Sequence, residues 1–598
     1  MNKQKLRAHR NAGPKYKFGV EIPRNSKHAR QLQEKLGHTK WTDAEGKELQ
    51  QLFDYKTFID KGKGAPIPQG YRVIKVRFVY DCKHDLRHKA RLVAGGHLTP
   101  EDDSAYSGVV SLKSMRLALL IGEINGLRPM VGDIGNAYLE AYTKEKVCFI
   151  AGPEFGPLAG HVLVISKALY GLRSSGARFH DKQHDTLTDM GFRPSYADPD
   201  LWIRDAGDCY EYICVYVDDL MAILKDPQHF FDLLTSKYKY LLKGVGDPEY
   251  HLGGNFGRDP DGTLYWSART YIQKMLDNYK RMFNELPTKT KSPIEKGDHP
   301  ELDDSEFLDA KGIKLYQSMV GALQWAVTLG RLDIACAVMW MSRFRAAPRA
   351  GHLQRLHRMY GYLRHAPDAA IRFRTHVPDN ERLYPEPDEQ HDWTRTPYGV
   401  HPEEFPDYAP LPKGNTVRHS CFVDANLMAC QVTGKSVTGI VHMVNGTPVD
   451  FYSKLQSTVE TATYSSEFVA ARTATEQVMD TRIVLMSMGV PLDGPTWMMG
   501  DNASVITSGS IPSSLLKKRH NALSYHCVRA AIASGIIIFR KVKGTENPSD
   551  ICTKFLPWAV FYPLIQHLLF QQGETLTKEE LEELSLDTRF VLSYTNIC

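Results

Sequence analysis

One short stretch, residues 213–224, constrains the fold of this 598-residue chain more than any other. It reads Ile-Cys-Val-Tyr-Val-Asp-Asp-Leu-Met-Ala-Ile-Leu, so two apolar runs meet at adjacent carboxylates, Asp218 and Asp219. Such runs around a short polar pair predict two strands joined by a tight turn. Two negative charges beside buried strands are costly unless a cation compensates them, and magnesium prefers their hard oxygen atoms. The alternative is an acidic turn on a surface hairpin.

A third carboxylate, Asp133, also ends an apolar run, Arg-Pro-Met-Val-Gly-Asp. If this run is a strand beside the hairpin, its carboxylate meets the hairpin tip. Three clustered acids could then hold two metal ions that clamp the attacking and leaving oxygens of a phosphoryl transfer. Tyr138 follows closely, with Asn136 between them. Its ring could stack under an incoming sugar and exclude a 2′-hydroxyl, and a core tyrosine is the alternative.

The composition excludes several classes of protein. The chain is 42% hydrophobic and 24% charged, an ordinary globular mixture, and its length predicts about three to five domains. A net charge of +5 does not by itself indicate a polyanion partner. The ten cysteines include no Cys-x-x-Cys pair, which argues against a zinc ribbon and favours reduced thiols. No apolar run approaches a membrane span, so we expect a soluble intracellular protein.

The order of predicted elements in the first half indicates an α+β fold. Apolar periodicity predicts the following elements: strands over 66–80, 89–94 and 130–133, helices over 113–124, 176–190 and 228–240, and the hairpin over 210–224. Residues 270–370 are expected to be mostly helical.

The second half contains a Pro-rich stretch and then a second ordered region. Residues 376–416 contain eight prolines and no periodicity, which indicates a linker or surface insertion. The later pattern predicts an α/β domain with a hairpin over 437–444 and 447–453 joined by an Asn445-Gly446 turn, helices over 463–480 and 520–534, and strands over 496–501 and 536–542. A closing helix is expected over 577–585, where Thr577 and Glu580 form a capping box.

Several motifs occur together in a characteristic order. They are Lys-Ala-Arg-Leu-Val-Ala (89–94), Asp-Ile-Gly-Asn-Ala-Tyr-Leu (133–139), Ala-Leu-Tyr-Gly-Leu-Arg (168–173), Tyr-Val-Asp-Asp (216–219) and Arg-Leu-Asp-Ile-Ala-Cys-Ala-Val (331–338). In this order the chain resembles the reverse transcriptase–RNase H region of copia-type LTR retrotransposons, from about residue 40 to 560.

The resemblance implies a right-hand polymerase of fingers, palm and thumb, with Asp133, Asp218 and Asp219 as magnesium ligands. Lys89 and Arg91 match the basic pair of the fingers. Because they are two apart on a strand they share a face, and both could reach one triphosphate. Tyr138 matches the position that checks the sugar, and Asn136 belongs to the same nucleotide-binding segment.

A second set of acids matches RNase H in chain order: Asp424, Glu467, Asp501 and Asp550. Each alone could be a cap or a surface acid; Asp550 could simply cap a helix. Together they imply two magnesium ions per active site, with manganese as a substitute, that activate a water and stabilise the leaving 3′-oxygen. His526 falls where the family has a second histidine and is weighed as structural.

The chain departs from the family pattern at several positions. Ser174, Ser175 and Gly176 replace the usual glutamine and proline, which weakens any glutamine contact to nucleotide or template. Leu332 replaces a proline, with an expected effect on a helix start only. Asn426 and Leu427 replace aspartate and tryptophan, and the Arg-Thr-Lys before the second histidine is missing. The family's mode of substrate binding is therefore less certain here than the chemistry of the four metal carboxylates. Ser465 stands where the family often has a second glutamate, leaving Glu467 as the unambiguous ligand.

These observations predict an α+β right-hand polymerase followed by an α/β RNase H-like domain. The predicted division is an N-terminal extension and the start of the fingers (1–60), fingers and palm (61–258), a mostly helical thumb or connection (259–375), a Pro-rich linker or insertion (376–416), the RNase H-like domain (417–560) and a helical tail (561–598).

The resemblance implies an RNA-directed DNA polymerase that also cleaves the RNA strand of hybrids. Its expected partners are an RNA template, a DNA or RNA primer, an RNA/DNA hybrid and dNTPs, with integrase or Gag of the same element as candidates and no membrane. The expected location is a cytoplasmic virus-like particle, with nuclear entry allowed. A host-recruited, catalytically silent nucleic-acid-binding protein is the alternative, although seven intact carboxylates argue against it. An integrase or transposase is disfavoured because no His/Cys zinc-binding domain precedes the acids.

Overall fold

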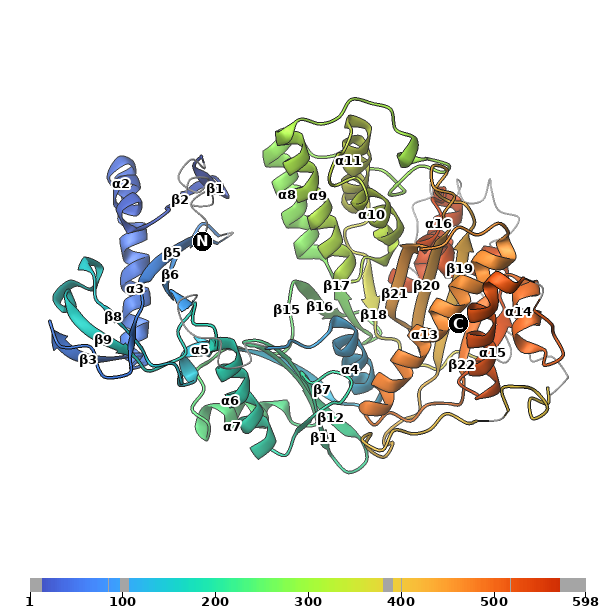
Figure 1. The fold of residues 1–598 in the computed structure, drawn as a ribbon, viewed down its shortest axis with the longest axis horizontal. Coiled ribbons are helices and arrows are strands. Elements are labelled where there is room, and N and C mark those ends of the chain that lie inside the picture. The colour runs from blue at the N-terminus through green and yellow to red at the C-terminus, as the bar shows by residue number, and fades with distance from the viewer. Residues whose placement is uncertain are drawn as a thin grey trace.

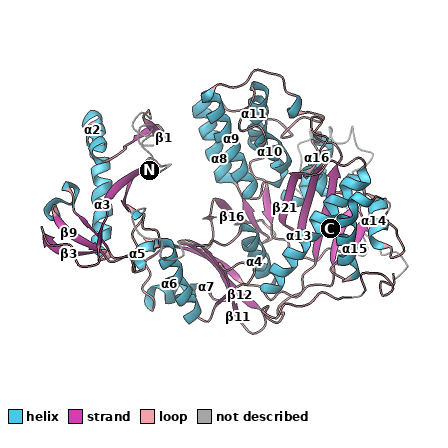
Figure 2. Cartoon of the chain, viewed as in Figure 1, coloured by secondary structure: helices cyan, strands magenta, loops and turns pink. Residues whose placement is uncertain are grey.

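The computed structural model describes residues 13–83, 85–96, 107–379, 391–399, 401–516 and 518–570. The names of the predicted regions are kept here as labels: in Figure 1 the predicted fingers lie at the left, the predicted palm below, the helices of the predicted thumb at the top and the C-terminal domain at the right. Helices and strands are mixed in every part of the molecule (Figure 2), which confirms the predicted α+β class. No helix in this described part has the length and apolar character needed to span a bilayer.

The fingers combine two helices, a hairpin and a small sheet. Their elements are α2 (Ser26–Leu36), α3 (Lys40–Asp54), the hairpin β5 (Val76–Cys82) and β6 (His88–Ala94), and the sheet β3 (Phe58–Lys63), β9 (His161–Ile165), β8 (Val147–Ile150) and β4 (Arg72–Val73). The single strand predicted over 66–80 is wrong. The chain passes from one sheet to the other at Ile74 and Lys75, whose backbone groups bond to Cys148 and Gly95.

The palm is a six-stranded antiparallel sheet of order β10-β11-β12-β13-β7-β14. Its strands are β10 (Arg193–Pro194), β11 (Leu201–Asp205), β12 (Tyr210–Tyr216), β13 (Asp219–Leu224), β7 (Arg128–Ile134) and β14 (Leu242–Gly246). Helices α6 (Ser175–Asp189) and α7 (Pro227–Ser236) cover one face, and α4 (Leu112–Ile124) covers the other. Successive residues of β12 and β13 therefore alternate between two cores, which explains their continuous apolar runs.

The thumb consists of helices on a small sheet that the sequence pattern missed. The helices are α8 (Arg269–Phe283), α9 (Ala310–Thr328), α10 (Ala335–Ser342) and α11 (Ala350–His365), and the sheet is β15 (Tyr250–His251), β16 (Gly254–Arg258), β17 (Leu264–Ser267) and β18 (Ala370–Arg372). Leu332 lies buried in a 3-10 turn (Leu332–Ile334) before α10. The flanking Arg331 and Asp333 form a buried ion pair of 2.6 Å, and position 332 thus lies at the helix start where the departure is expected to act.

The C-terminal domain is a five-stranded sheet of order β21-β20-β19-β22-β23, in which β22 and β23 are parallel to β19. Its elements are β19 (His419–Asn426), β20 (Val437–Val444), β21 (Thr447–Leu455), α13 (Thr463–Ser487), β22 (Thr496–Gly500), α14 (Ala503–Ser510), α15 (Ala522–Ala533), β23 (Ile537–Lys541) and α16 (Trp558–Leu569). Helices α13, α14 and α15 cover one face. This arrangement agrees with the predicted RNase H-like order, and helix α13 runs beyond the predicted end at residue 480.

The C-terminal domain packs directly on the palm and thumb. Arg116 of α4 is buried and donates hydrogen bonds to the carbonyls of Thr328 in the thumb and Val449 in β21. The Tyr212 hydroxyl donates to the Met488 carbonyl at 3.1 Å. The described part of 376–416 contains no helix or strand, in agreement with a linker. The helix predicted over 577–585 lies outside the described residues.

Candidate active sites

The palm brings Asp133, Asp218 and Asp219 together from two distant segments. Asp133 near the end of β7 is the register partner of Asp219 at the start of β13. Val217 and Asp218 form the two-residue turn between Tyr216 and Asp219, with Val217 in the left-handed region at φ 57°. The Ile134 amide donates to the Asp218 carbonyl at 2.8 Å, which fixes the turn beside β7. The three acids therefore lie at one end of adjacent strands, as the sequence predicted.

Charge accumulates at this palm trio of Asp133, Asp218 and Asp219. Burial, followed by the neighbouring carboxylates Asp218 and Asp133, raises the pKa of Asp219 to about 6. Burial and the charge of Asp218 likewise raise the pKa of Asp133, while the nearby Lys243 opposes the rise. Among the described residues, no basic side chain forms a salt bridge with any of the three. The trio is thus a half-buried group of like charges that a cation would stabilise.

Arg91 of the predicted basic pair lies against an aromatic stack. Lys89 and Arg91 lie on β6, and the Arg91 guanidinium sits 4.7 Å from the ring centre of Tyr170. The Tyr170 ring packs in turn on Tyr138, with ring centres 4.9 Å apart. Burial and the charge of Arg91 lower the pKa of Lys89. Tyr170 therefore links the predicted triphosphate residue Arg91 to the predicted sugar-checking residue Tyr138.

Sequence reasoning did not assign a role to Tyr170, although the motif 168–173 contains it. The sequence feature that could have indicated a role for Tyr170 is the glycine that follows it, Gly171. Gly171 has φ +92°, and a Cβ there would lie 2.3 Å from the Ala94 carbonyl oxygen. The Ala94 amide donates to the Tyr170 carbonyl at 2.7 Å, so the glycine permits this segment to dock closely on the strand carrying Arg91.

Asn136 and Tyr138 lie directly after the palm strand β7. Asn136 adopts the left-handed conformation with φ 54° and precedes the short helix α5 (Ala137–Glu140). Tyr138 is half-buried, and its ring also contacts Phe179 of the palm core at 6.2 Å between centres. Its ring thus packs at the edge of the palm core and in the stack with Tyr170. These contacts are compatible with a core tyrosine and with a residue that excludes a 2′-hydroxyl.

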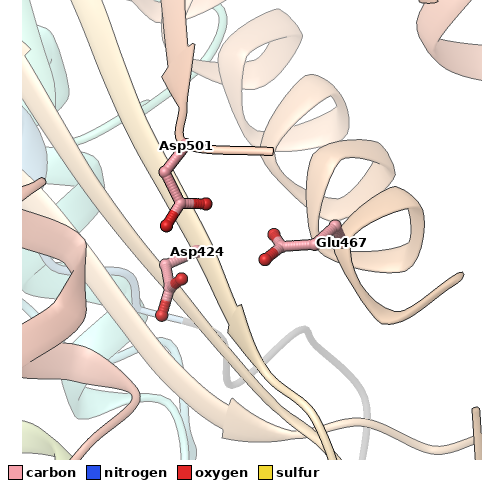
Figure 3. Close-up of side chains that lie close together, drawn as sticks. All are labelled: Asp424, Glu467 and Asp501. Atoms are coloured by element: carbon pink, nitrogen blue, oxygen red, sulfur yellow. The ribbon is translucent and has the colours of Figure 1, made fainter. Parts of the chain in front are cut away.

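Four acids of the C-terminal domain converge from four elements. Asp424 lies on β19, Glu467 on α13, Asp501 just after β22, and Asp550 in a 3-10 turn (Pro548–Cys552). Oxygens of Asp424, Glu467 and Asp501 lie within 4.8 Å of one another, and Figure 3 shows the three carboxylates turned toward a common point. Within the described residues, this is the group of three potential ligands that meets that limit. Among the described residues, the carboxylate oxygens of the palm trio do not all lie within this limit.

A lysine that sequence reasoning missed completes this site. The Lys554 ammonium lies 2.8 Å from Asp550 Oδ1 and 3.2 Å from Asp424 Oδ2. The neighbouring Thr553 hydroxyl donates a hydrogen bond to Asp424 Oδ2. The available signal was the spacing of four between Asp550 and Lys554, a favourable spacing for an ion pair.

The donor set fits a divalent cation. Burial, followed by the charges of Asp424 and Asp501, raises the pKa of Glu467 strongly, and the pKa values of Asp501 and Asp550 are raised for the same physical reasons. Burying this many carboxylates near one another is costly unless positive charge is added. Carboxylate oxygens are also the ligands that magnesium and manganese prefer.

The family departures have local structural explanations. The Ser174 hydroxyl donates to Glu145 at 2.6 Å, and the Ser175 hydroxyl donates to the Leu169 carbonyl at 2.7 Å. The Asn426 amide donates to the Thr553 carbonyl at 3.2 Å. His526 pairs with the Tyr398 hydroxyl of the linker through Nδ1 at 2.6 Å, a structural contact that accords with the weight given to it.

Comparison with known proteins now places these sites in context. Residues 65–295 match the family model described as reverse transcriptase (RNA-dependent DNA polymerase). The chain is 25% identical over 564 residues to the retrovirus-related Pol polyprotein from transposon RE1 of Arabidopsis thaliana, an alignment covering 92% of this chain and 35% of the relative. It is also 25% identical to that of transposon TNT 1-94 of Nicotiana tabacum, covering 83% of this chain and 35% of the relative.

The chain therefore spans about a third of the length of these curated relatives. A solved foamy viral protease-reverse transcriptase in complex with RNA/DNA hybrid aligns with 95% of this chain and 57% of that chain, at 13% identity and a TM-score of 0.41. The family match spans the palm trio, Lys89, Arg91 and Tyr138. Residues 65–295 are thus similar to reverse transcriptases, within a longer similarity to the Pol polyproteins of transposons RE1 and TNT 1-94.

Proposed function

We propose that this chain is an RNA-directed DNA polymerase whose C-terminal domain cleaves the RNA strand of RNA/DNA hybrids. The observation that carries the polymerase activity is the register of Asp133 with Asp219, beside the turn that holds Asp218. The family match over residues 65–295 supports the same assignment. The four convergent acids of the C-terminal domain support the hybrid cleavage.

In the palm, Asp133, Asp218 and Asp219 would hold magnesium or manganese. When bound, such ions supply charge neutralisation for the attacking 3′-oxygen and the leaving pyrophosphate. Lys89 and Arg91 would bind the triphosphate of the incoming dNTP, one as a point charge and the other as a planar fork. Tyr138, supported by Tyr170, would exclude a 2′-hydroxyl, and Asn136 would shape the loop beneath it.

In the C-terminal domain, Asp424, Glu467, Asp501 and Asp550 would hold the metal ions, two per site. Bound ions would supply an activated water and stabilise the leaving 3′-oxygen. The acids bind and orient, while recognition of the RNA strand depends on its 2′-hydroxyls. Contacts elsewhere would be mainly to phosphates, so we expect salt-sensitive binding with little sequence preference.

We also propose the division into fingers and palm, thumb, linker and RNase H-like domain. The sheet β15–β18 supports a thumb that begins near Tyr250, before the predicted boundary at 259, because β15 and β16 share that sheet. RNA template, primer, hybrid and dNTPs are the proposed substrates. Integrase or Gag of the same element and a cytoplasmic particle remain proposals by resemblance.

The experiment is extension of a DNA primer on poly-rA, run beside cleavage of a labelled RNA/DNA hybrid, with magnesium and with EDTA. The wild-type chain should perform both reactions only with magnesium. Asp133→Asn should lose extension, whereas Asp185→Asn, on an exposed position of the palm helix α6, should retain it. A wild-type chain that binds the primer–template but extends nothing would favour the catalytically silent alternative.

A further inference from the structure

We propose that Lys554 is a built-in cation of the C-terminal site, which must leave the Asp424–Asp550 pair before a divalent ion can bind there. This inference rests on the proposed RNase H function. Lys554 supplies the positive charge beside Asp424 and Asp550, whereas Glu467 and Asp501 have no such lysine contact. The two metal positions would therefore differ in how readily they fill.

The contacts of Lys554 divide the four acids unequally. Its ammonium lies within 3.2 Å of oxygens of both Asp424 and Asp550. Among the described residues, no basic side chain forms a salt bridge with Glu467 or Asp501. Asp424 belongs to both groups, because its carboxylate also lies with those of Glu467 and Asp501. Glu467 and Asp501 thus lack this lysine contact, whereas Asp550 and both oxygens of Asp424 are paired with the ammonium.

The local structure holds this ammonium in place without fixing it permanently. Asp550 and Lys554 are four residues apart around a 3-10 turn, and the Lys554 amide donates to the Asp550 carbonyl at 3.0 Å. The Lys554 side chain is 32% exposed, whereas that of Asp424 is 1% exposed. A long flexible lysine chain at the edge of a buried site can swing outward while its backbone stays anchored.

The consequence is an order of binding. A first divalent ion should enter beside Glu467 and Asp501, which lack a lysine contact, and it can take Asp424 while Lys554 keeps its contact with Asp550. A second ion at Asp424 and Asp550 has to compete with the ammonium, because a lysine and a metal cannot share the same carboxylate oxygens at contact distance. Lys554 would act as a positioning residue that holds this pair of acids in the metal-free protein.

The test measures metal binding rather than activity. The full chain carrying Asp218→Asn and Asp219→Asn serves as the background, so that the palm trio contributes little. Bound Mn²⁺ is counted by electron paramagnetic resonance during titration without nucleic acid. The background should bind one ion and then a weaker second ion. Adding Lys554→Met should tighten the second ion by about tenfold, and Lys554→Arg should leave it weak.

Several outcomes separate this inference from the proposed function. If Asp424→Asn in the background leaves Mn²⁺ binding unchanged, the metal site itself is wrong. If Asp424→Asn removes binding but Lys554→Met does not tighten the second ion, only the inference about Lys554 is overturned. Should Lys554→Met fail to fold, Lys554→Gln provides the same comparison with Lys554→Arg. Equal affinities in that pair would also overturn the inference.

Discussion

The palm trio and the C-terminal acids use the same kind of side chain in different settings. Asp133, Asp218 and Asp219 are half-buried at strand ends beside a tight turn. Asp424 and Glu467 are buried between a sheet and a helix, and Lys554 already pairs with Asp424. The proposed polymerase site would have to admit a nucleotide at each step, which requires an open site, whereas a preassembled buried site needs its own counter-charge to be stable without metal.

Substitution of Glu467, the acid on helix α13, should produce the largest effect. This effect should be confined to the C-terminal site and leave the palm trio unaffected. Glu467→Gln should lower hybrid cleavage by at least about a hundredfold, because a metal ligand matters more than the supporting residues around it. Primer extension should stay within about twofold, since the palm trio is separate. Glu476→Gln, on a half-exposed position of the same helix, is the matched control. An unchanged cleavage gel would remove Glu467 from the site.

The aromatic stack offers a second test, on the palm side. Tyr170→Leu removes the ring under the exposed Arg91, so KM for dNTP should rise by about two- to fivefold with little change in kcat, because a cation–π contact at an exposed site contributes about 0.5 to 1 kcal/mol. Tyr170→Phe keeps the ring and should behave like the wild type. An equal loss of kcat and of hybrid cleavage in Tyr170→Leu would instead indicate a folding defect.

A third change sharpens the role of the palm tyrosine. Tyr138→Val should admit ribonucleotides, because a smaller side chain leaves room for the 2′-hydroxyl. The products should become alkali-sensitive, while Tyr142→Val, at a position 69% exposed, should give alkali-resistant DNA. Resistant products from Tyr138→Val would return this residue to a purely structural role in the palm core.

The smallest expected effect concerns stability without metal. The folded-state pKa of Glu467 is raised above its unfolded value, so its ionisation opposes folding. Stability in EDTA should therefore fall as pH rises from the unfolded pKa toward the folded one. Glu467→Gln should remove part of this decline and raise the unfolding temperature at pH 8 by a few degrees, measured by calorimetry. A steeper decline in the variant would contradict this sign.

Much of this arrangement could be predicted from the sequence, because local patterns encoded it. The apolar runs around Asp218 and Asp219 gave the hairpin, and Asn445-Gly446 gave the turn between β20 and β21. The thumb sheet could not be predicted, because its strands are two to five residues long and β18 returns from far along the chain.

The missing parts of the sites share a physical cause. Tyr170 and Lys554 act through residues distant in sequence, Arg91 and Tyr138 in one case and Asp424 in the other. Periodicity reports which face of an element is buried, and it does not report which side chain of another element will meet it. The order of the motifs identified the acidic residues. The side chains that contact the predicted site residues could be identified only from the folded structure.

The central claim is that the two acidic clusters are separate active sites. The most direct measurement follows primer extension and hybrid cleavage on one preparation of Asp218→Asn. Extension should fall by at least about a hundredfold while cleavage stays within about twofold of the wild type. Loss of both activities in a folded variant, or retention of both, would contradict it.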